Sequence, residues 1–498
     1  MRRPTTVLAV PTLISLTVVF ALLGSVAART SAAASKPKPK PTASKPKPAS
    51  GKTPPLPPGP RTFTTGIVDT IFSLSPAGNM WLSRTVAAGA QTILVWVSWP
   101  SVAPERPLPG SDPSDPANPA YNWGTLDATV RAAVAHRLTV VLSITHAPVW
   151  AEGPDQPATA IPGTWRPNAA AAGAFAKAVA RRYSGSFNPG TGVLPRVRYF
   201  QAWTEPNLPN QISPQWVRTG GRWVAESPTI YRSILNADYT AIESVNSSDV
   251  VITGGTSPYG DNPGGQRMRP ALFWQNVLCL TAQLKPARCS NPAHFDILAH
   301  DPYSFGGPLK GSRSNDVTLA DMWRLTRLLT AADRTGRALP RIQHPVWVTE
   351  FGWNSRPPKP GGVPLGTRAR WIDQAFYELW REGISNAMWY LIVDMPPAKT
   401  YVTWQTGLYY DNGRRKPDYE AFRFPFIAKP LAKGRMEVWA VPPRAGTVRV
   451  QVRKSGRWTT ALSLRARPHV VIDRALVVPG RPMFRAVVGS DVSLPWRP

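Results

Sequence analysis

The chain has 498 residues, of which 43% are hydrophobic, so it holds enough apolar material for a large core and is not disordered throughout. Its 58 Lys and Arg exceed its 29 Asp and Glu, which gives a formal net charge of +29. The basic residues are spread along the chain rather than gathered in one stripe, which argues against a nucleic-acid partner. The two Cys and six scattered His argue against a disulfide scaffold and against a zinc site, so we expect no metal.

Residues 1–28 have the pattern of an export signal. Arg2 and Arg3 precede an apolar stretch, and small residues end it at Ala28. At about 20 residues, the stretch is also long enough to span a bilayer. A cleaved signal peptide and a retained membrane anchor therefore both stay open. Either alternative predicts an exported protein that is secreted or held at the cell surface.

Residues 29–60 are predicted to be a linker rich in Lys and Pro. Its repeated Lys-Pro pairs favour an extended polyproline geometry, and the Lys side chains repel one another. The linker is therefore a stiff, positively charged spacer. Such a spacer suits attraction to an anionic wall polymer or membrane surface.

Export also bears on the two cysteines. Cys279 and Cys289 lie in one polar stretch, ten residues apart. In an oxidising compartment we expect them to form a structural disulfide.

Between residues 61 and 426, short apolar runs alternate with helical patterns. The runs are continuously hydrophobic, which indicates strands buried on both faces, as in a parallel sheet. Helical spacing is clear over 124–135, 169–182 and 230–245. Eight strands alternating with helices predict an α/β fold, a (β/α)₈ TIM barrel. An open doubly wound sheet is less favoured, because no Gly-rich phosphate turn follows the first strand. The predicted strands are 65–69, 92–99, 138–144, 197–203, 249–255, 295–300, 345–350 and 387–393.

Residues 427–498 change in character. Alternating apolar and polar residues, separated by Gly or Pro turns, predict a small all-β, sandwich-like domain. Its many Arg, together with Trp439, Trp458 and Trp496, leave open whether it binds a carbohydrate or packs against the barrel. We favour packing.

Two glutamates stand where predicted strands end. Glu205 follows the fourth strand in Trp-Thr-Glu-Pro-Asn, residues 203–207, and Glu350 ends the seventh in Thr-Glu-Phe-Gly-Trp, residues 349–353. The loops after barrel strands build the active site, so both carboxylates are expected at one end of the barrel. Charged groups at the ends of apolar strands are costly to desolvate unless they are used or paired.

These motifs resemble the acid/base and nucleophile motifs of retaining glycoside hydrolases of clan A. The pattern is most similar to family 39, with the family 5 cellulase-like enzymes next, and it covers roughly residues 63–426. The resemblance implies an enzyme that cleaves O-glycosidic bonds, of β configuration, in a polysaccharide or glycoconjugate. It assigns Glu205 as acid/base and Glu350 as nucleophile, and it requires no cofactor.

Two carboxyl groups suit this chemistry, because one must protonate the leaving oxygen while the other, ionised, attacks the anomeric carbon. Retaining enzymes place the two groups about 5–5.5 Å apart. The charge of Glu350 should keep Glu205 protonated until attack neutralises it.

Position at strand ends and the resemblance together indicate further sugar contacts. His300 and Tyr303 are expected to hydrogen-bond the nucleophile and its sugar, and Trp389 to form a platform under the reacting sugar. Asn207 should also shape the loop after Glu205. The substrate-binding candidates are His146, Trp150, Thr204, Asn207, His300, Tyr303, Trp353 and Trp389. Three aspartates near strand ends are favoured as structural: Asp69, Asp301 and Asp394.

The chain departs from the clan pattern at two places. Thr204 stands where the clan has an Asn that contacts the sugar 2-hydroxyl, and strand 92–99 lacks an Arg near the nucleophile. A hydroxyl lacks the second donor of an amide, and without the Arg the pKa of Glu350 should rise. These departures leave open a non-catalytic glycan-binding protein on a degenerate barrel. A transglycosylase that remodels wall glycan also stays open, because a retaining enzyme can pass the covalent sugar to an alcohol instead of water. All three predict an oligo- or polysaccharide partner, and we expect a monomer.

Overall fold

The computed structural model describes residues 59–74, 77–396 and 403–498. The predicted signal or anchor and nearly all of the linker lie outside these described residues. Within them, no helix is both long and apolar enough to cross a membrane.

Eight parallel strands form the central sheet in the order β7-β4-β3-β2-β1-β14-β11-β9. Two parallel bridges, Ile252 with Ile297 and Thr256 with His300, join β7 to β9 and close the sheet into a barrel. All eight predicted strands are present, which confirms the (β/α)₈ prediction. The strands are β1 (Thr64–Val68), β2 (Thr92–Ser98), β3 (Thr139–Thr145), β4 (Tyr199–Ala202), β7 (Val250–Thr253), β9 (Leu298–His300), β11 (Val346–Phe351) and β14 (Asn386–Tyr390).

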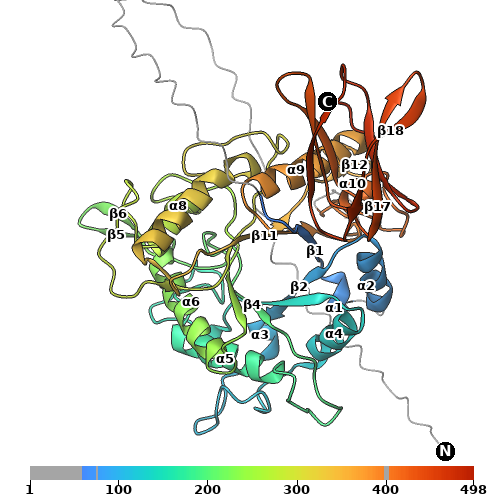
Figure 1. Cartoon of the computed structure of the whole chain (residues 1–498). Helices are drawn as coiled ribbons and strands as arrows, with labels where there is room; N and C mark the ends of the chain where they lie inside the picture. Colours follow the sequence, from blue (N-terminus) through green and yellow to red (C-terminus); the bar gives the residue numbers. More distant parts are fainter. Residues whose placement is uncertain (1–58, 75–76, 397–402) are drawn as a thin grey trace, which may run out of the picture. The chain divides into compact units, whose positions relative to one another are not determined.

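The helices form a ring around these strands (Figure 1). Helix α5 begins after Asn168, whose side chain accepts a hydrogen bond from the Ala171 N–H and so caps the Ala-rich segment. The helices are α1 (Ile71–Leu74), α2 (Gly78–Ala87), α3 (Trp99–Val102), α4 (Gly124–Ala135), η1 (Val149–Ala151), α5 (Ala169–Arg182), α6 (Ser227–Glu243), α7 (Pro270–Val277), η2 (Leu319–Asp321), α8 (Met322–Thr335), α9 (Leu365–Arg381) and α10 (Tyr419–Arg423).

Side chains of the barrel strands alternate between two cores. One apolar set fills the barrel interior, and a larger set packs between the strands and the helices. Short strands pair into two-stranded sheets outside the barrel: β5 (Trp216–Thr219) with β6 (Arg222–Ala225), β8 (Ala293–His294) with β10 (Ala338–Leu339), and β12 (Ser355–Arg356) with β13 (Val363–Pro364).

The C-terminal part forms two antiparallel sheets, as its alternating pattern predicted. One has the order β15-β16-β19 and the other β18-β17-β20-β21. Their strands are β15 (Phe426–Pro430), β16 (Arg435–Ala440), β17 (Gly446–Lys454), β18 (Arg457–Ala466), β19 (Ile472–Val477), β20 (Phe484–Val488) and β21 (Asp491–Val492).

This β module packs on the barrel through α9. Trp439 is fully buried, and its ring contacts those of Tyr377 and Trp380, with centroids 5.8 and 5.9 Å away. The Tyr377 hydroxyl also donates a hydrogen bond of 2.9 Å to Glu437 in β16. Trp496 is buried as well. These two tryptophans therefore serve packing, the interpretation that the sequence favoured.

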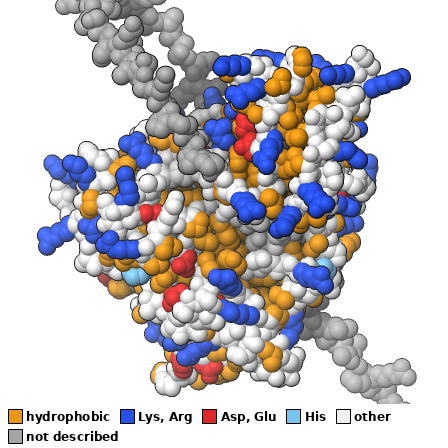
Figure 2. Space-filling model, in the orientation of Figure 1, with side chains coloured by type: hydrophobic (Ala, Val, Ile, Leu, Met, Phe, Trp, Pro, Cys, Tyr) orange, Lys and Arg blue, Asp and Glu red, His pale blue; other side chains and the backbone are white. Residues whose placement is uncertain are grey.

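Cys279 and Cys289 form a disulfide, as predicted, with sulfur atoms 2.09 Å apart. The basic side chains are scattered over the visible face of the molecule, including the β module at the upper right (Figure 2). This distribution agrees with the sequence, in which the charge forms no single stripe.

Candidate active site

Glu205 lies just beyond β4, on a turn with an unusual backbone. Trp203 and Glu205 have positive φ angles of 74° and 36°, which non-glycine residues adopt only when their surroundings enforce it. The Trp203 N–H donates to the Ile144 carbonyl at 2.9 Å, and the Glu205 N–H donates to the Gly255 carbonyl at 2.7 Å. The turn is therefore tied to the ends of β3 and β7, and it holds Glu205 at the carboxyl end of the barrel.

A register shift in β11 sets the direction of the Glu350 side chain. Val348 pairs with Ala387 of β14, but the next paired residue, Phe351, lies opposite Trp389. Phe351 is three residues after Val348, whereas Trp389 is only two residues after Ala387. The extra residue in β11 forms a β-bulge that contains Glu350. Bulges redirect side chains at sheet ends. Both Glu205 and Glu350 keep part of their surface accessible to solvent.

A third carboxyl group, that of Asp301, lies beside the two glutamates. It follows β9, is 2% exposed, and accepts a hydrogen bond of 2.7 Å from the Thr349 hydroxyl. It also accepts one from the backbone N–H of Glu350. Gly255 makes room for it, because a Cβ there would lie 2.4 Å from an Asp301 oxygen. Asp301 therefore anchors the strand end that carries Glu350.

Burial raises the pKa of all three groups, and repulsion between carboxylates adds to the rise at Glu350 and Asp301. Burial is the largest cause, and it takes the pKa of Glu205 to about 7 and that of Glu350 to about 8. The charge of Glu205 contributes to the rise at Glu350, and both glutamate charges raise the pKa of Asp301 well above its usual range. Glu205 and Glu350 therefore titrate together near neutral pH.

Hydrogen-bond donors partly oppose these rises. The Tyr303 hydroxyl donates to Oε1 of Glu350 at 2.7 Å and lowers the pKa of Glu350, and the Ser257 side chain does the same for Glu205. Among the described residues, no Lys or Arg is paired with either glutamate.

Aromatic rings line the site around Tyr303. Trp404 and Tyr390 lie with ring centroids 5.7 and 6.5 Å from that of Tyr303, and 5.6 Å from each other. Tyr390 faces the barrel interior, and its pKa is raised well above the usual range by burial and then by the charge of Glu350. Tyr390 was not among the expected sugar contacts, although it directly follows the predicted platform Trp389.

Trp389 itself lies elsewhere, and the prediction of a sugar platform there is wrong. Its side chain has no exposed surface and belongs to the core between strands and helices. Its Nε1 donates to the Thr406 carbonyl at 2.8 Å. Trp353 is also buried, with Nε1 donating to the Ser304 carbonyl at 2.6 Å. Both tryptophans hold loops rather than offering a surface to a sugar.

His300 and Asn207 are likewise structural, so their prediction as substrate contacts is corrected. His300 is fully buried, with Nδ1 2.8 Å from the Thr256 hydroxyl and Nε2 2.8 Å from the Val317 carbonyl. Neither ring nitrogen is left for a sugar or for Glu350. Asn207 is also fully buried, and its amide bonds to backbone groups of Ser257 and Met268. It shapes the loop after Glu205, as expected.

Three other candidates keep accessible surface. Thr204 precedes Glu205 and is half-buried, as is His146 at the end of β3. Burial lowers the pKa of His146 to about 4, so the ring is neutral at neutral pH. Trp150 is half-buried, and its Nε1 donates to the Ala103 carbonyl at 3.0 Å. Contact of these residues with a sugar stays a prediction.

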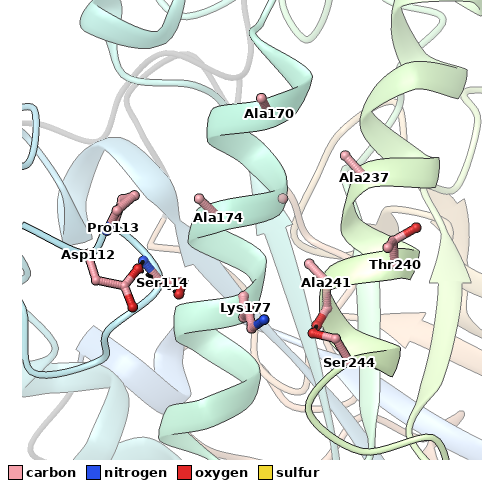
Figure 3. Close-up of a pocket in the computed structure, with 11 residues that line it drawn as sticks. Asp112, Pro113, Ser114, Ala170, Ala174, Lys177, Ala237, Thr240, Ala241 and Ser244 are labelled. Carbon is pink, nitrogen blue, oxygen red and sulfur yellow. Dashed lines mark hydrogen bonds between the residues drawn. The ribbon is translucent and has the colours of Figure 1, made fainter.

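A depression of about 550 Å³ lies away from these carboxylates, between α5 and α6. Small side chains of the two helices face each other there (Figure 3). A Cβ on Gly173 would lie 3.0 Å from the Ala237 carbonyl oxygen, which shows how closely the helices approach. Neither glutamate lines this depression. In the part of the chain that the structure describes, no group of three or more His, Cys, Asp or Glu could hold a metal ion.

No protein-family model and no curated protein matches the sequence. A family 39 glycoside hydrolase from the gut symbiont Bacteroides cellulosilyticus WH2 has a similar structure, with a TM-score of 0.51 and 17% identity over 84% of this chain and 81% of that one. A glucosidase from Croceicoccus marinus gives a TM-score of 0.47 at 14% identity, over 84% of this chain and 94% of its own. The structural neighbours are thus glycoside hydrolases, as the sequence resemblance implied. What this chain shares with the first of them is the fold.

Proposed function

We propose that the protein is a retaining glycoside hydrolase that cleaves β-linked O-glycosidic bonds in an oligo- or polysaccharide. One observation carries the proposal: two accessible, electrostatically coupled glutamates lie at the carboxyl ends of β4 and β11 of a (β/α)₈ barrel. The family 39 glycoside hydrolase from Bacteroides cellulosilyticus WH2 has the same fold and supports this proposal.

In the first step Glu350 attacks the anomeric carbon while Glu205 protonates the leaving oxygen. In the second, Glu205 takes a proton from a water that displaces the sugar from Glu350. The hydrogen bond from Tyr303 favours the ionised form of Glu350. The Ser257 hydroxyl can accept as well as donate, so it tolerates a protonated Glu205. Attack requires the form of the pair in which Glu205 carries the shared proton and Glu350 is ionised.

The proposed function is tested by measuring hydrolysis of a panel of glycosides. The panel contains 4-nitrophenyl β-glycosides of glucose, xylose, mannose and galactose, and the β-1,4-linked tetrasaccharides of glucose, xylose and mannose. Turnover with β-configured first products, detected by NMR, supports the proposal. Binding without turnover would favour the glycan-binding alternative that Thr204 and the missing Arg suggest. Products longer than the substrate would favour the transglycosylase.

Activity should peak near neutral or mildly alkaline pH. The pKa values of both glutamates are raised, so Glu350 loses its charge as pH falls through a value well above the usual 4.5. Glu205 in turn loses its proton as pH rises. A pH profile of kcat/KM checks this expectation. An optimum between pH 4 and 5, flanked by loss at neutral pH, would contradict the described electrostatics.

Replacing Tyr303 with Phe should move the acidic limb of that profile to higher pH. The hydroxyl lowers the pKa of Glu350, so its loss raises that pKa further and fewer molecules carry an ionised nucleophile. We expect kcat to fall about tenfold, with thermal stability nearly unchanged. An acidic limb that does not move would mean that Tyr303 does not act on Glu350.

Residues 61–426 are proposed as the catalytic domain and residues 427–498 as a domain that supports α9. The N-terminal sequence pattern and the Cys279–Cys289 disulfide support export, to the medium or the cell surface. The basic linker is proposed to favour anionic wall or membrane surfaces.

A further inference from the structure

A phenylalanine stands exposed in the loop that follows β9. Phe305 has 70% of its surface exposed, more than most large apolar residues among those described. An exposed apolar residue alone needs no explanation. Phe305 differs because the structure fixes its ring in place.

The Phe305 ring is held by Tyr259, which lies in the loop after β7. The ring of Tyr259 lies parallel to that of Phe305, with an interplanar angle of 15° and centroids 5.5 Å apart. The Phe305 backbone N–H also donates a hydrogen bond to the Tyr259 hydroxyl. One face of the Phe305 ring is therefore covered, and the other is open to solvent.

Further hydrogen bonds hold the loop that carries Phe305. The Ser304 hydroxyl donates to the Gly307 carbonyl at 2.9 Å, and Trp353 Nε1 donates to the Ser304 carbonyl at 2.6 Å. A Cβ on Gly307 would lie 2.7 Å from the ring of Trp371, so this turn also packs closely against α9. The Phe305 ring is thus preorganised, and a ligand would lose little entropy in ordering it.

Phe305 also belongs to the loop that reaches the carboxylates. Phe305 is two residues from Tyr303, whose hydroxyl is 2.7 Å from Glu350. Two residues span at most about 7 Å, so Phe305 stands on the same loop as the tyrosine that binds Glu350, at the end of the barrel where cleavage is proposed.

We propose that Phe305, stacked on Tyr259, is a binding subsite for a second pyranose ring of the substrate, next to the sugar that is cleaved. This inference rests on the proposed function. An aromatic face offers a flat apolar surface that matches the C–H face of a pyranose, while the sugar hydroxyls stay in water. The subsite predicts that the enzyme prefers oligo- or polysaccharides over simple glycosides.

The test compares Phe305→Ala with Phe305→Trp, and uses Leu309→Ala as the matched control. Leu309 lies in the same loop and is 61% exposed, but it has no ring. Each variant is assayed with the panel's 4-nitrophenyl glycosides and tetrasaccharides. Phe305→Ala should lower kcat/KM for the tetrasaccharide about tenfold and leave the aryl glycoside within about twofold. Phe305→Trp, which keeps an aromatic face, should retain the tetrasaccharide kcat/KM that Phe305→Ala loses, and Leu309→Ala should match the parent.

Three outcomes would overturn the subsite. Equal losses on both kinds of substrate would show that Phe305 supports the loop of Tyr303 instead. No loss on either would show that the ring binds no sugar, while the parent's turnover would leave the proposed function intact. If the parent neither cleaves nor binds any member of the panel, the proposed function fails and the subsite falls with it.

Discussion

Replacing Glu350 with Gln is expected to lower kcat by about 10⁴-fold or more on any glycoside that the parent cleaves. The amide keeps the shape of the side chain but cannot attack the anomeric carbon or form the covalent intermediate. Thermal unfolding should change little, because Gln can still accept the hydrogen bond from Tyr303.

A matched control is available on the outer helical layer. Glu378 in α9 is also half-buried, and burial also raises its pKa, but it lies away from the barrel mouth. Glu378→Gln should leave kcat within about twofold of the parent. Equal activity of Glu350→Gln and the parent would remove Glu350 from the mechanism.

Glu205→Ala separates the two roles. Without the acid, a poor leaving group should be lost slowly, whereas an activated 2,4-dinitrophenyl leaving group needs no proton and should still form the intermediate. Added azide should then release a glycosyl azide of retained configuration, because it attacks the intermediate in place of water. Azide with Glu350→Ala should instead give the inverted product. Exchange of these two results would exchange the assignments of Glu205 and Glu350.

The second large effect concerns stability. Replacing Arg368 with Met is expected to lower the free energy of unfolding by about 3–5 kcal/mol, because it leaves a buried carboxylate without its partner. Arg368 in α9 and Asp418 are both fully buried and form a two-pronged ion pair, with Nη2 to Oδ1 at 3.0 Å. The guanidinium also donates to the carbonyls of Trp353 and Gly407, at 3.0 and 2.9 Å. It thus joins the loops after β11 and β14.

Urea unfolding of the variant measures this loss. Arg370→Met is the matched control on the same helix, because Arg370 is exposed and stacks on Trp496 with a centroid distance of 4.1 Å. Its loss should cost less than about 1 kcal/mol. Similar stability of the two variants would show that the buried pair contributes no more than a surface contact.

The sequence was sufficient to predict the barrel and the position of the two glutamates at the carboxyl ends of its strands. Continuous apolar runs and clear helical spacing located all eight strands, and Glu205 and Glu350 follow from their place at strand ends. The orientation of side chains within β14 was not predictable, because Met388, Trp389 and Tyr390 are all apolar or aromatic and both faces of the strand are buried. Trp389 was expected at the site because the resemblance implied a Trp platform at the end of this strand, and the pattern gave no sign that Tyr390 faces the barrel interior instead.

Long-range hydrogen bonds explain the other errors. His300 bonds to the Val317 carbonyl, and Asn207 bonds to that of Met268, so their polar atoms are satisfied by loops distant in the sequence. No local pattern reveals such partners. Asp301 was expected to be structural. The structure places it against the Glu350 backbone, a position that depends on the glycine at 255.

Trapping of the intermediate tests the central claim most directly. A 2-deoxy-2-fluoro β-glycoside with a dinitrophenyl leaving group, in the sugar that the parent cleaves, should inactivate the enzyme. The fluorine slows both the attack and the release of the sugar from the nucleophile, whereas the activated leaving group speeds only the attack, so the covalent intermediate accumulates. Mass spectrometry of the digested protein should then find the fluorosugar on the peptide that contains Glu350, and no label in Glu350→Gln. A label on another residue, or steady turnover without a label, would contradict the double-displacement account.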